Sequence, residues 1–343
     1  MTPRTTPAFR LPRRRALAAA AVGVAAVLTL SSCSAEAQNS GKDAAKDSGV
    51  KTRMVTDIAG KVEVPADPQR IVSVDFYSPA ALVDLGVNPI GVVEGFDDPD
   101  PNLRPKKYHD ALKKAATVGT YYELNVEAVA KQDPDMIFAE TRFLRKGELE
   151  RLQGIAPVVQ LDASGVGAWE DRTLMIAAAV GKADEGKRQQ TVFRKRADEL
   201  KTKYADILTK NKIAVFGYGQ DQSTWGTYPA GHFYVPSWDA VGAQFRSFTE
   251  GEHKGEPGTV SQWLSLEQIG KLSNADILIH SYGAKDFVTS LSKNTVWKNL
   301  PAVKDGLVFE NIPAAVVSSF EWGTASLDAL DTLLARIDAK AGA

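Results

Sequence analysis

Two stretches of the chain follow one pattern. They are Asn125-Val-Glu127-Ala-Val-Ala-Lys-Gln-Asp-Pro-Asp135-Met-Ile-Phe138 and Ser265-Leu-Glu267-Gln-Ile-Gly-Lys-Leu-Ser-Asn-Ala-Asp276-Ile-Leu-Ile279. Each holds a residue typical of a helix N-cap, a glutamate in the first helical turn, a short amphipathic helix, an aspartate and an apolar strand. In the second copy, Ser265 and Gln268 predict a capping box. The pattern therefore predicts a helix followed by a strand at each place.

A second pair of similar segments lies upstream of these copies. Arg70-Ile-Val-Ser-Val-Asp-Phe76 resembles Lys212-Ile-Ala-Val-Phe-Gly-Tyr218, since both have a basic residue, an apolar strand and an aromatic residue. The spacing between glutamate and aspartate differs by one residue in the downstream copies, so we infer similar architecture and not a recent duplication. Two related lobes with a cleft between them are expected.

The first residues are predicted to be an export signal. Arg13-Arg14-Arg15 precedes an apolar run from Ala16 to Leu30, which is shorter than the roughly 20 residues of a membrane-spanning helix. The following Leu30-Ser-Ser-Cys33 resembles a bacterial lipobox, which implies a signal peptide over residues 1–32 and a lipid on Cys33. Because Cys33 is the only cysteine, an internal disulfide or a cysteine-based zinc site is excluded. The sequence of this signal does not decide between export by the Sec route and export by the twin-arginine route.

Composition limits the partners. Residues 33–52 are mostly small and polar, so we expect a disordered tether. The signal holds five arginines and no acid, which leaves 36 basic residues against 42 acidic ones in the rest of the chain. That balance gives no reason to expect nucleic acid as a partner.

From Val62 onward, short apolar strands alternate with helical stretches, which is typical of an α/β fold. An N-terminal α/β lobe is expected over residues 53–182. Its predicted strands are 71–74, 90–93, 136–138 and 158–161, and its predicted helices are 79–85, 126–131, 148–153 and 172–180.

A single stiff helix is predicted over residues 183–210, because this stretch has no proline and its apolar residues recur near helical spacing. A C-terminal α/β lobe is expected over residues 211–343, with strands at 213–216, 277–280 and 307–309 and a closing helix from Thr324 to about Ala339. Ten of the chain's 28 aromatic residues lie between Phe216 and Trp263, in a stretch rich in glycine and proline. Such aromatic residues are candidates to line a pocket, although we expect about half of them to be buried in the hydrophobic core.

These motifs together resemble the substrate-binding lipoproteins of ABC importers for iron–siderophores, haem and cobalamin. The resemblance covers about residues 53–340 and is carried by the lipobox, Val118-Gly-Thr-Tyr-Tyr-Glu-Leu-Asn-Val-Glu127, the long helix, Trp297-Lys-Asn-Leu-Pro301 through Pro313, and Trp322-Gly323. It implies two lobes with central β-sheets flanked by helices, bridged by one long rigid helix, with the ligand in the cleft. It also implies a monomer that works with an importer permease and its ATPase.

The resemblance further implies one exposed glutamate on each lobe that docks into arginine-bearing pockets of the permease. Glu127 and Glu267 stand at those positions. A carboxylate can pair with arginine through two hydrogen bonds, so one such contact on each lobe would fix the position of both lobes on the permease. The alternative is that both are ordinary acids of a helix N-terminus.

For the ligand, hydroxamate binders of this family place an arginine after the first-lobe Val-Gly and a tyrosine after the next strand. Here Tyr121 and Arg142 stand at these positions, so the two residue types are exchanged. Pairing of Arg142 with Glu140 is the alternative to a ligand contact. Arg172 and Arg246 are further cations that could face the cleft. Aromatic residues expected to line the walls are Phe76, Tyr77, Tyr218, Trp225, Phe245, Tyr282, Phe320 and Trp322.

A hydroxamate chelate such as ferrioxamine is favoured, because aromatic walls can bury its methylene skeleton while arginine and tyrosine satisfy its oxygens. Catecholate chelates carry more negative charge and call for several cations. Haem or cobalamin is the alternative within the same family, with Tyr121 and His280 as the axial pair to test for haem.

Other classes of protein find less support. The four histidines are scattered, which disfavours a zinc or manganese receptor. The sequence has no nucleophile elbow, phosphate loop or His-Glu-x-x-His motif, so an extracytoplasmic enzyme is a remote alternative. We expect no catalytic residues and no cofactor, with a ferric siderophore complex as the ligand.

Overall fold

The computed structural model describes residues 51–96, 104–120, 122–161, 168–219, 222–245 and 263–341. The predicted signal segment 1–32, Cys33, most of the predicted tether 33–52, Tyr121 and Arg246 lie outside these residues. Within the described ranges, no helix combines the length and the apolar character needed to cross a bilayer.

The N-terminal lobe is built on a five-stranded parallel sheet in the order β5-β4-β3-β6-β7. Its central strands are buried on both faces, which fits their continuous apolar sequence. The strands are β3 (Ile71–Ser73), β4 (Gly91–Val92), β5 (Ala116–Thr117), β6 (Met136–Glu140) and β7 (Val158–Leu161); the helices are α1 (Ser78–Asp84), α2 (Lys106–Leu112), α3 (Val126–Lys131), η1 (Thr141–Phe143), α4 (Glu148–Gln153) and α5 (Ala168–Ala179).

A hairpin that the sequence analysis did not predict precedes this sheet. Strand β1 (Thr52–Asp57) pairs antiparallel with β2 (Gly60–Pro65). The Asp57 carboxylate accepts hydrogen bonds from the backbone of Ala59 and Gly60, and Gly60 has a φ of 131°, which favours glycine at this turn. Strand β1 begins inside the segment predicted as tether, so the ordered lobe starts slightly earlier than expected.

The C-terminal lobe repeats the arrangement with the order β10-β9-β8-β11-β12. In both lobes the first strand is central, the second and third lie on one side, and the fourth and fifth on the other. Strands β8, β11 and β12 are parallel, whereas β9 runs antiparallel to β8. The elements are β8 (Ile213–Tyr218), β9 (Thr224–Thr227), α8 (Pro236–Ala240), β10 (Leu264–Ser265), η2 (Leu266–Asn274), β11 (Ile277–His280), α9 (Lys285–Leu291), α10 (Thr295–Lys298), α11 (Pro301–Lys304) and β12 (Val308–Glu310). The predicted α/β class with two lobes is confirmed.

The repeated sequence pattern has a structural explanation in its aspartates. The Asp135 carboxylate accepts backbone hydrogen bonds from Gln69 and Arg70, just before β3. The Asp276 carboxylate accepts the matching bond from Lys212, just before β8, at 2.8 Å. Each aspartate therefore ties the start of its own strand to the start of the lobe's central strand.

The caps of the two copies differ. Asn125 accepts a hydrogen bond from the Ala128 backbone at 2.9 Å, so its predicted capping role is confirmed. Ser265 makes no side-chain cap, and the following element η2 is a 3-10 helix. The predicted capping box of Ser265 and Gln268 is therefore wrong.

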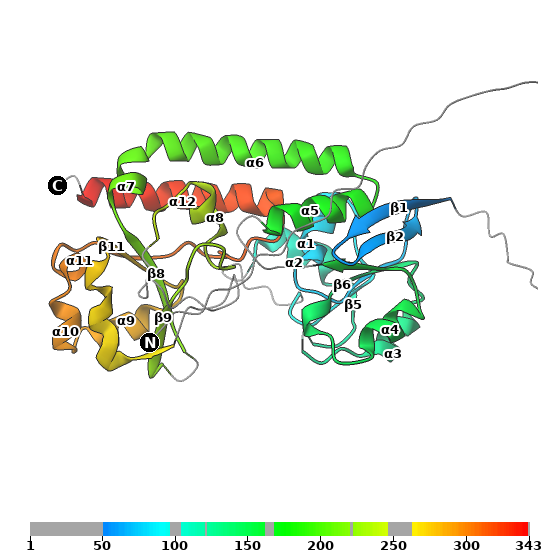
Figure 1. Ribbon diagram of the computed structural model, residues 1–343, viewed down its shortest axis with the longest axis horizontal. Coiled ribbons are helices and arrows are strands. Elements are labelled where there is room, and N and C mark those ends of the chain that lie inside the picture. Colours follow the sequence, from blue (N-terminus) through cyan, green and yellow to red (C-terminus); the bar gives the residue numbers. More distant parts are fainter. Residues whose placement is uncertain are drawn as a thin grey trace, which may run out of the picture. The chain divides into compact units, whose positions relative to one another are not determined.

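Two long helices lie side by side: α6 (Ala183–Lys203) and α12 (Phe320–Ala341), with α12 over the C-terminal lobe and α6 reaching toward the first lobe (Figure 1). The predicted single helix over 183–210 is interrupted, because α6 ends at Lys203 and α7 (Ala205–Lys210) follows Tyr204. The hydroxyl of Tyr204 donates to the Asp331 carboxylate of α12, and the Tyr204 ring is buried. This tertiary contact accompanies the break, where no glycine or proline marks it in the sequence.

One hydrophobic cluster runs from the first lobe through the long helices into the second lobe. It contains Val92 from the first sheet, Phe193 of α6, and Ile213 and Ile277 from the second sheet. The joint between the lobes is therefore packed core and not a pair of extended linkers.

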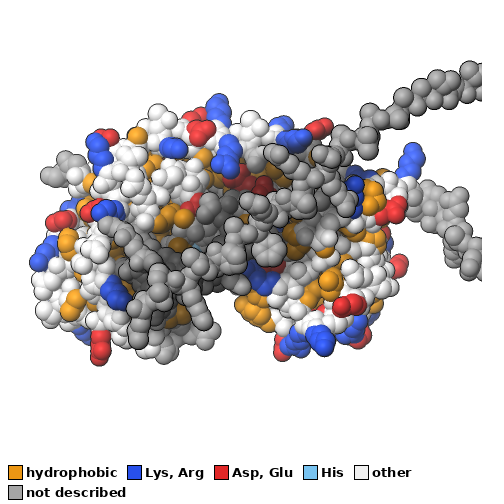
Figure 2. Space-filling view, viewed as in Figure 1, with side chains coloured by type: hydrophobic (Ala, Val, Ile, Leu, Met, Phe, Trp, Pro, Cys, Tyr) orange, Lys and Arg blue, Asp and Glu red, His pale blue; other side chains and the backbone are white. Residues whose placement is uncertain are grey.

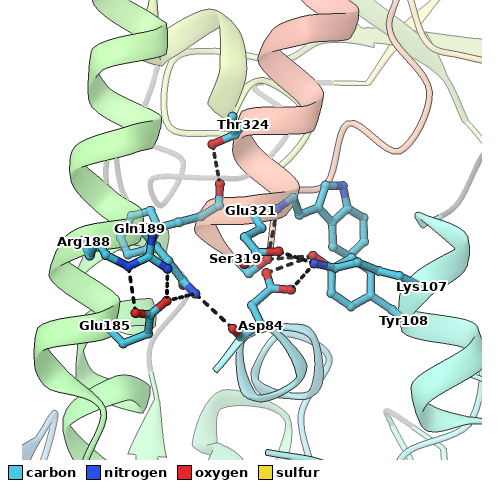
Figure 3. Close-up of polar contacts among 11 residues, drawn as sticks. Asp84, Lys107, Tyr108, Glu185, Arg188, Gln189, Ser319, Glu321 and Thr324 are labelled. Atoms are coloured by element: carbon cyan, nitrogen blue, oxygen red, sulfur yellow. Dashed lines mark hydrogen bonds and ion pairs between the residues drawn. The ribbon is translucent and has the colours of Figure 1, made fainter. Parts of the chain in front are cut away.

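Polar contacts reinforce this joint where α1, α2, α6 and α12 meet (Figure 3). The Lys107 ammonium lies 2.6 Å from the buried Asp84 carboxylate and also contacts Glu321 of α12. The Tyr108 hydroxyl bonds Asp84 at 2.9 Å and lies 3.1 Å from the Ser319 hydroxyl. The amide of Gln189 in α6 donates to the backbone carbonyl of Asp84 at 3.0 Å.

Candidate ligand-binding site

Sheet topology marks one edge of each lobe. In open α/β sheets, ligands bind beyond the carboxyl ends of the strands where the strand order reverses. These points lie after β3 and β6 in the first lobe and after β8 and β11 in the second. The residues that end or follow these strands include five of the predicted ligand residues: Phe76, Tyr77, Arg142, Tyr218 and Tyr282.

Arg142 lies in η1, directly after β6. Its side chain is 41 % exposed, and its guanidinium lies 2.6 Å from the carboxylate of Glu140, which is only 1 % exposed. The guanidinium also lies over the ring of Phe143, 4.6 Å from its centroid. Arg142 thus has the contact with Glu140 that the sequence analysis gave as the alternative, and it still presents surface to solvent.

Tyr77 is buried beside a second arginine. The guanidinium of Arg172, from α5, lies 3.9 Å from the centroid of the Tyr77 ring, and burial raises the pKa of Tyr77 to about 12. The neighbouring Asp75 carboxylate accepts backbone hydrogen bonds from Tyr77 and Ser78. Burial raises the pKa of Asp75, which these hydrogen bonds and the charge of Arg172 oppose. Tyr77 is therefore a buried residue at the carboxyl edge of the first sheet.

Phe76 lies partly buried at the same edge, with its ring 5.5 Å from Phe96. A third arginine, Arg104, has its guanidinium 5.1 Å from the Phe76 centroid and 4.4 Å from that of Phe96. Arg104 is buried and was not predicted as a site residue. Nothing in its local sequence distinguished it from a surface arginine.

The second lobe contributes Tyr218 and Tyr282. The Tyr218 ring lies 5.1 Å from Phe287, and the Tyr282 side chain is exposed just after β11. Tyr218 is the last residue of β8 and Tyr282 follows β11, the two strands at which the order of the second sheet reverses.

Four other predicted wall residues lie elsewhere. Trp225, Phe320 and Trp322 are buried in the core, where the Trp225 indole donates to the Ser265 carbonyl and the Trp322 indole to the Ala314 carbonyl. Phe245 pairs with Ile213, at the amino end of β8, away from the carboxyl edge. Trp225 is the cross-strand neighbour of Tyr218, and Tyr218 packs against the cluster that holds Trp225, whereas Phe245, Phe320 and Trp322 are not gathered with them.

An aromatic cluster that was not assigned to the site lies between β9 and α8. It consists of Tyr228, His232, Phe233 and Tyr234, with neighbouring ring centroids 4.3 to 5.0 Å apart. The Tyr228 hydroxyl lies 3.2 Å from the hydroxyl of Ser281, which places that end of the cluster at the carboxyl end of β11. Phe233 and Tyr234 are exposed. The density of aromatic residues from Phe216 to Trp263 indicated this segment without singling these four out.

His232 is the buried centre of that cluster. Burial lowers its pKa to about 3, so the ring is neutral at physiological pH. Its Nδ1 accepts a hydrogen bond from the Tyr234 backbone. Within the described ranges, no group of three histidine, cysteine or acidic side chains could hold a metal ion. The arrangement thus offers exposed aromatic surface from Phe233 and Tyr234.

The two predicted docking carboxylates lie at helix starts. Glu127 is in the first turn of α3 with a 79 % exposed side chain, 2.5 Å from the guanidinium of Arg151. Glu267 is exposed in the first turn of η2. Each is thus accessible to a partner surface, although Glu127 already has an ion pair.

A hollow of about 840 Å³ lies along α6, lined by residues between Gln190 and Lys203. Basic and acidic side chains are interspersed over the face that carries this helix (Figure 2). None of the residues that line the hollow belongs to either sheet edge. We therefore place the candidate site at the sheet edges, where topology and aromatic residues coincide.

Comparison with known proteins identifies the family. Residues 77–314 match the family described as periplasmic binding protein. The chain belongs to this family. It is 30 % identical to the probable siderophore-binding lipoprotein YfiY of Bacillus subtilis, over 88 % of this chain and 90 % of the relative. It is 28 % identical to the Fe(3+)-citrate-binding protein YfmC of the same organism, over 88 % and 91 %.

A solved structure gives the same answer. The siderophore periplasmic binding protein from the fuscachelin gene cluster of Thermobifida fusca superimposes with a TM-score of 0.63 at 26 % identity, covering 80 % of this chain and 98 % of that one. This periplasmic binding protein is thus a siderophore-type substrate-binding protein of an ABC importer, and not an enzyme. Such proteins hand their ligand to a permease that works with an ATPase, so the ligand is cargo and not a cofactor.

Proposed function

We propose that this periplasmic binding protein captures a ferric hydroxamate siderophore of the ferrioxamine type. The observation that supports this most is the half-exposed guanidinium of Arg142 at the carboxyl end of β6. Guanidinium N–H groups donate well to chelate oxygens, and the positive charge of the group is permanent.

Apolar surface for the chelate skeleton is available at both edges. In the first lobe, Phe76 follows β3, which pairs with β6, the strand that precedes Arg142. In the second lobe, Tyr282, Phe233 and Tyr234 expose aromatic surface. Burial of a methylene skeleton against such rings contributes about 25 cal/mol per Å². We assign ligand contacts to Phe76, Arg142, Tyr218 and Tyr282, with Tyr121 as a further donor.

The mechanism of delivery follows from the stiff joint. Because the core and the Asp84–Lys107–Glu321 contacts continue from lobe to lobe, loading is expected to cause a small rocking motion of the lobes. The loaded protein then docks through Glu127 and Glu267 to arginines of the permease. A lipid on Cys33 holds the monomer at the outer face of the cell membrane.

Tryptophan fluorescence tests this proposal. The mature protein is titrated with ferrioxamine, ferrichrome, ferric citrate, a ferric tris-catecholate, haem and cobalamin, with the six tryptophans as reporters. We expect saturable quenching with one equivalent of a trihydroxamate, at a lower concentration than with any other ligand. Tighter binding of citrate, haem or cobalamin would contradict the hydroxamate assignment, and quenching by none of the ferric chelates would contradict the proposed function.

A further inference from the structure

The buried carboxylate of Glu140 sits directly behind the most exposed cation of the candidate site. Glu140 is the last residue of β6, and its 1 % exposed side chain lies 2.6 Å from the guanidinium of Arg142. A buried charge is costly without a partner, whereas the guanidinium of Arg142 could remain solvated by itself. Arg142 therefore supplies the counter-charge that the buried Glu140 carboxylate requires, and Glu140 in turn sets the net charge that this pair presents to a ligand.

The neighbouring cation has a similar counter-charge. Arg172 is buried against the Tyr77 ring, and its charge stabilises the ionised form of the buried Asp75. Arg104 is also buried, between Phe76 and Phe96. Arg142 is thus the one accessible guanidinium among these three, and its field is offset by a carboxylate within contact distance.

A carboxylate in contact with the ligand-facing cation has a clear electrostatic effect. In a partly buried site the field of one charge is strongly offset by an opposite charge in contact with it. Glu140 therefore cancels much of the attraction that Arg142 would exert on an anion. A guanidinium has five N–H donors, so the contact of Arg142 with one oxygen of Glu140 does not by itself exhaust its capacity to donate to a ligand.

We infer that Glu140 is the charge-selecting residue of the site: by neutralising Arg142 it favours ferric chelates without net negative charge and disfavours polyanionic ones. This inference rests on the proposed function and deepens it, because it assigns selectivity to a residue behind the ligand contact. Selectivity then arises from a repulsive element as well as from an attractive one.

The test compares the dissociation constants of a neutral ferric trihydroxamate (ferrichrome) and an anionic ferric tris-catecholate (ferric enterobactin) for each variant. Wild type is expected to prefer ferrichrome at least tenfold. Glu140→Gln keeps the shape and removes the charge, and is expected to shift the ratio at least tenfold toward the catecholate. The matched control is Glu123→Gln, which removes a carboxylate from the exposed pair with Arg145 and should leave the ratio unchanged.

The Arg142→Ala background tests the route of the effect. Without Arg142 the buried Glu140 carboxylate has lost its counter-charge and is expected to take up a proton, so Glu140→Gln should leave the ratio unchanged in that background. A shift that persists there would overturn the inference, as would an unchanged ratio in Glu140→Gln alone. If Glu140→Gln does not fold by circular dichroism, the wild-type ratio decides, since equal or tighter binding of the catecholate overturns the inference.

Failure of the inference is distinguishable from failure of the proposed function. A wild-type protein that binds no ferric chelate contradicts the proposed function itself. A wild-type protein that binds ferrichrome without discriminating against the anionic chelate contradicts only the role of Glu140.

Discussion

Trp322 stacks on Tyr108 with ring centroids 5.1 Å apart, and this contact joins the start of α12 to α2 across the joint between the lobes. The Trp322 indole N–H also donates to the Ala314 carbonyl at 2.9 Å. The ring is almost wholly buried in the cluster that both lobes share. Trp322 thus packs as part of the stiff joint.

Trp322→Ala should therefore reduce stability. Removing a buried tryptophan leaves a cavity and typically costs about 3–5 kcal/mol of unfolding free energy. Urea denaturation followed by circular dichroism measures this loss. Trp263→Ala is the matched control, because Trp263 is 47 % exposed and its loss should change stability by about 0.5 kcal/mol or less. Equal losses in the two variants would contradict the structural role of Trp322.

Arg142→Ala should weaken binding of a ferric trihydroxamate at least tenfold, which corresponds to about 1.4 kcal/mol. The reason is the loss of the accessible guanidinium donors at the carboxyl end of β6. Isothermal titration calorimetry gives the dissociation constants. Arg188→Ala removes an exposed arginine of α6 that pairs with Glu185, and it should leave affinity unchanged. An unchanged dissociation constant for Arg142→Ala would make Arg142 a surface residue only.

The double variant Glu127→Ala with Glu267→Ala should abolish uptake of radioactive ferric siderophore by cells and leave ligand affinity intact. Both carboxylates are exposed at helix starts, so their loss removes the docking contacts without touching the sheet edges. Glu199→Ala, on the exposed side of α6, serves as the control and should support normal uptake. A collapse of affinity in the double variant would place these carboxylates in the ligand site instead.

Asp239 predicts a pH dependence of stability. Burial raises its pKa from 3.8 to about 7, although its carboxylate accepts a hydrogen bond from the Gly231 backbone at 2.9 Å. Between these two pH values the folded state holds a proton that the unfolded state has lost, so the unfolding free energy falls as pH rises from 3.8 to about 7. Above that range this contribution is constant.

Asp239→Asn should flatten that fall, because asparagine accepts the same hydrogen bond without titrating. Urea denaturation at several pH values between 4 and 8 measures the slope. Asp206→Asn, at an exposed position paired with Lys210, should retain the wild-type slope. If the slope of Asp239→Asn matches that of wild type, Asp239 titrates normally in the folded protein.

Local signals predicted many elements because caps, apolar runs and breakers are encoded in short segments. The bounds of Val126–Lys131, Glu148–Gln153, Val158–Leu161 and Ile277–His280 agree with the structure. In strands β1 and β2, buried residues alternate with exposed polar ones, and neither strand has a long apolar run. The sequence analysis missed the hairpin for this reason. The break at Tyr204 was missed because it accompanies a contact with Asp331, more than 100 residues away in the chain.

The site was predicted in part, for a related reason. Residues just after a predicted strand, such as Arg142 and Tyr218, could be placed at a strand end from the local sequence alone. Phe320 and Trp322 could not, because the closing helix was expected to begin at Thr324 and instead begins at Phe320. That shift puts both rings on the first helical turn, where they pack against Trp169, Phe193 and Tyr108.

The central claim is that both sheet edges hold one ferric chelate. A crystal structure of the mature protein with a ferric trihydroxamate, with iron located by anomalous scattering, tests this claim most directly. We predict the iron within reach of Arg142 on one side, with Tyr218 or Tyr282 against the chelate on the other. Iron bound along the α6 hollow, or contacts confined to one lobe, would contradict it.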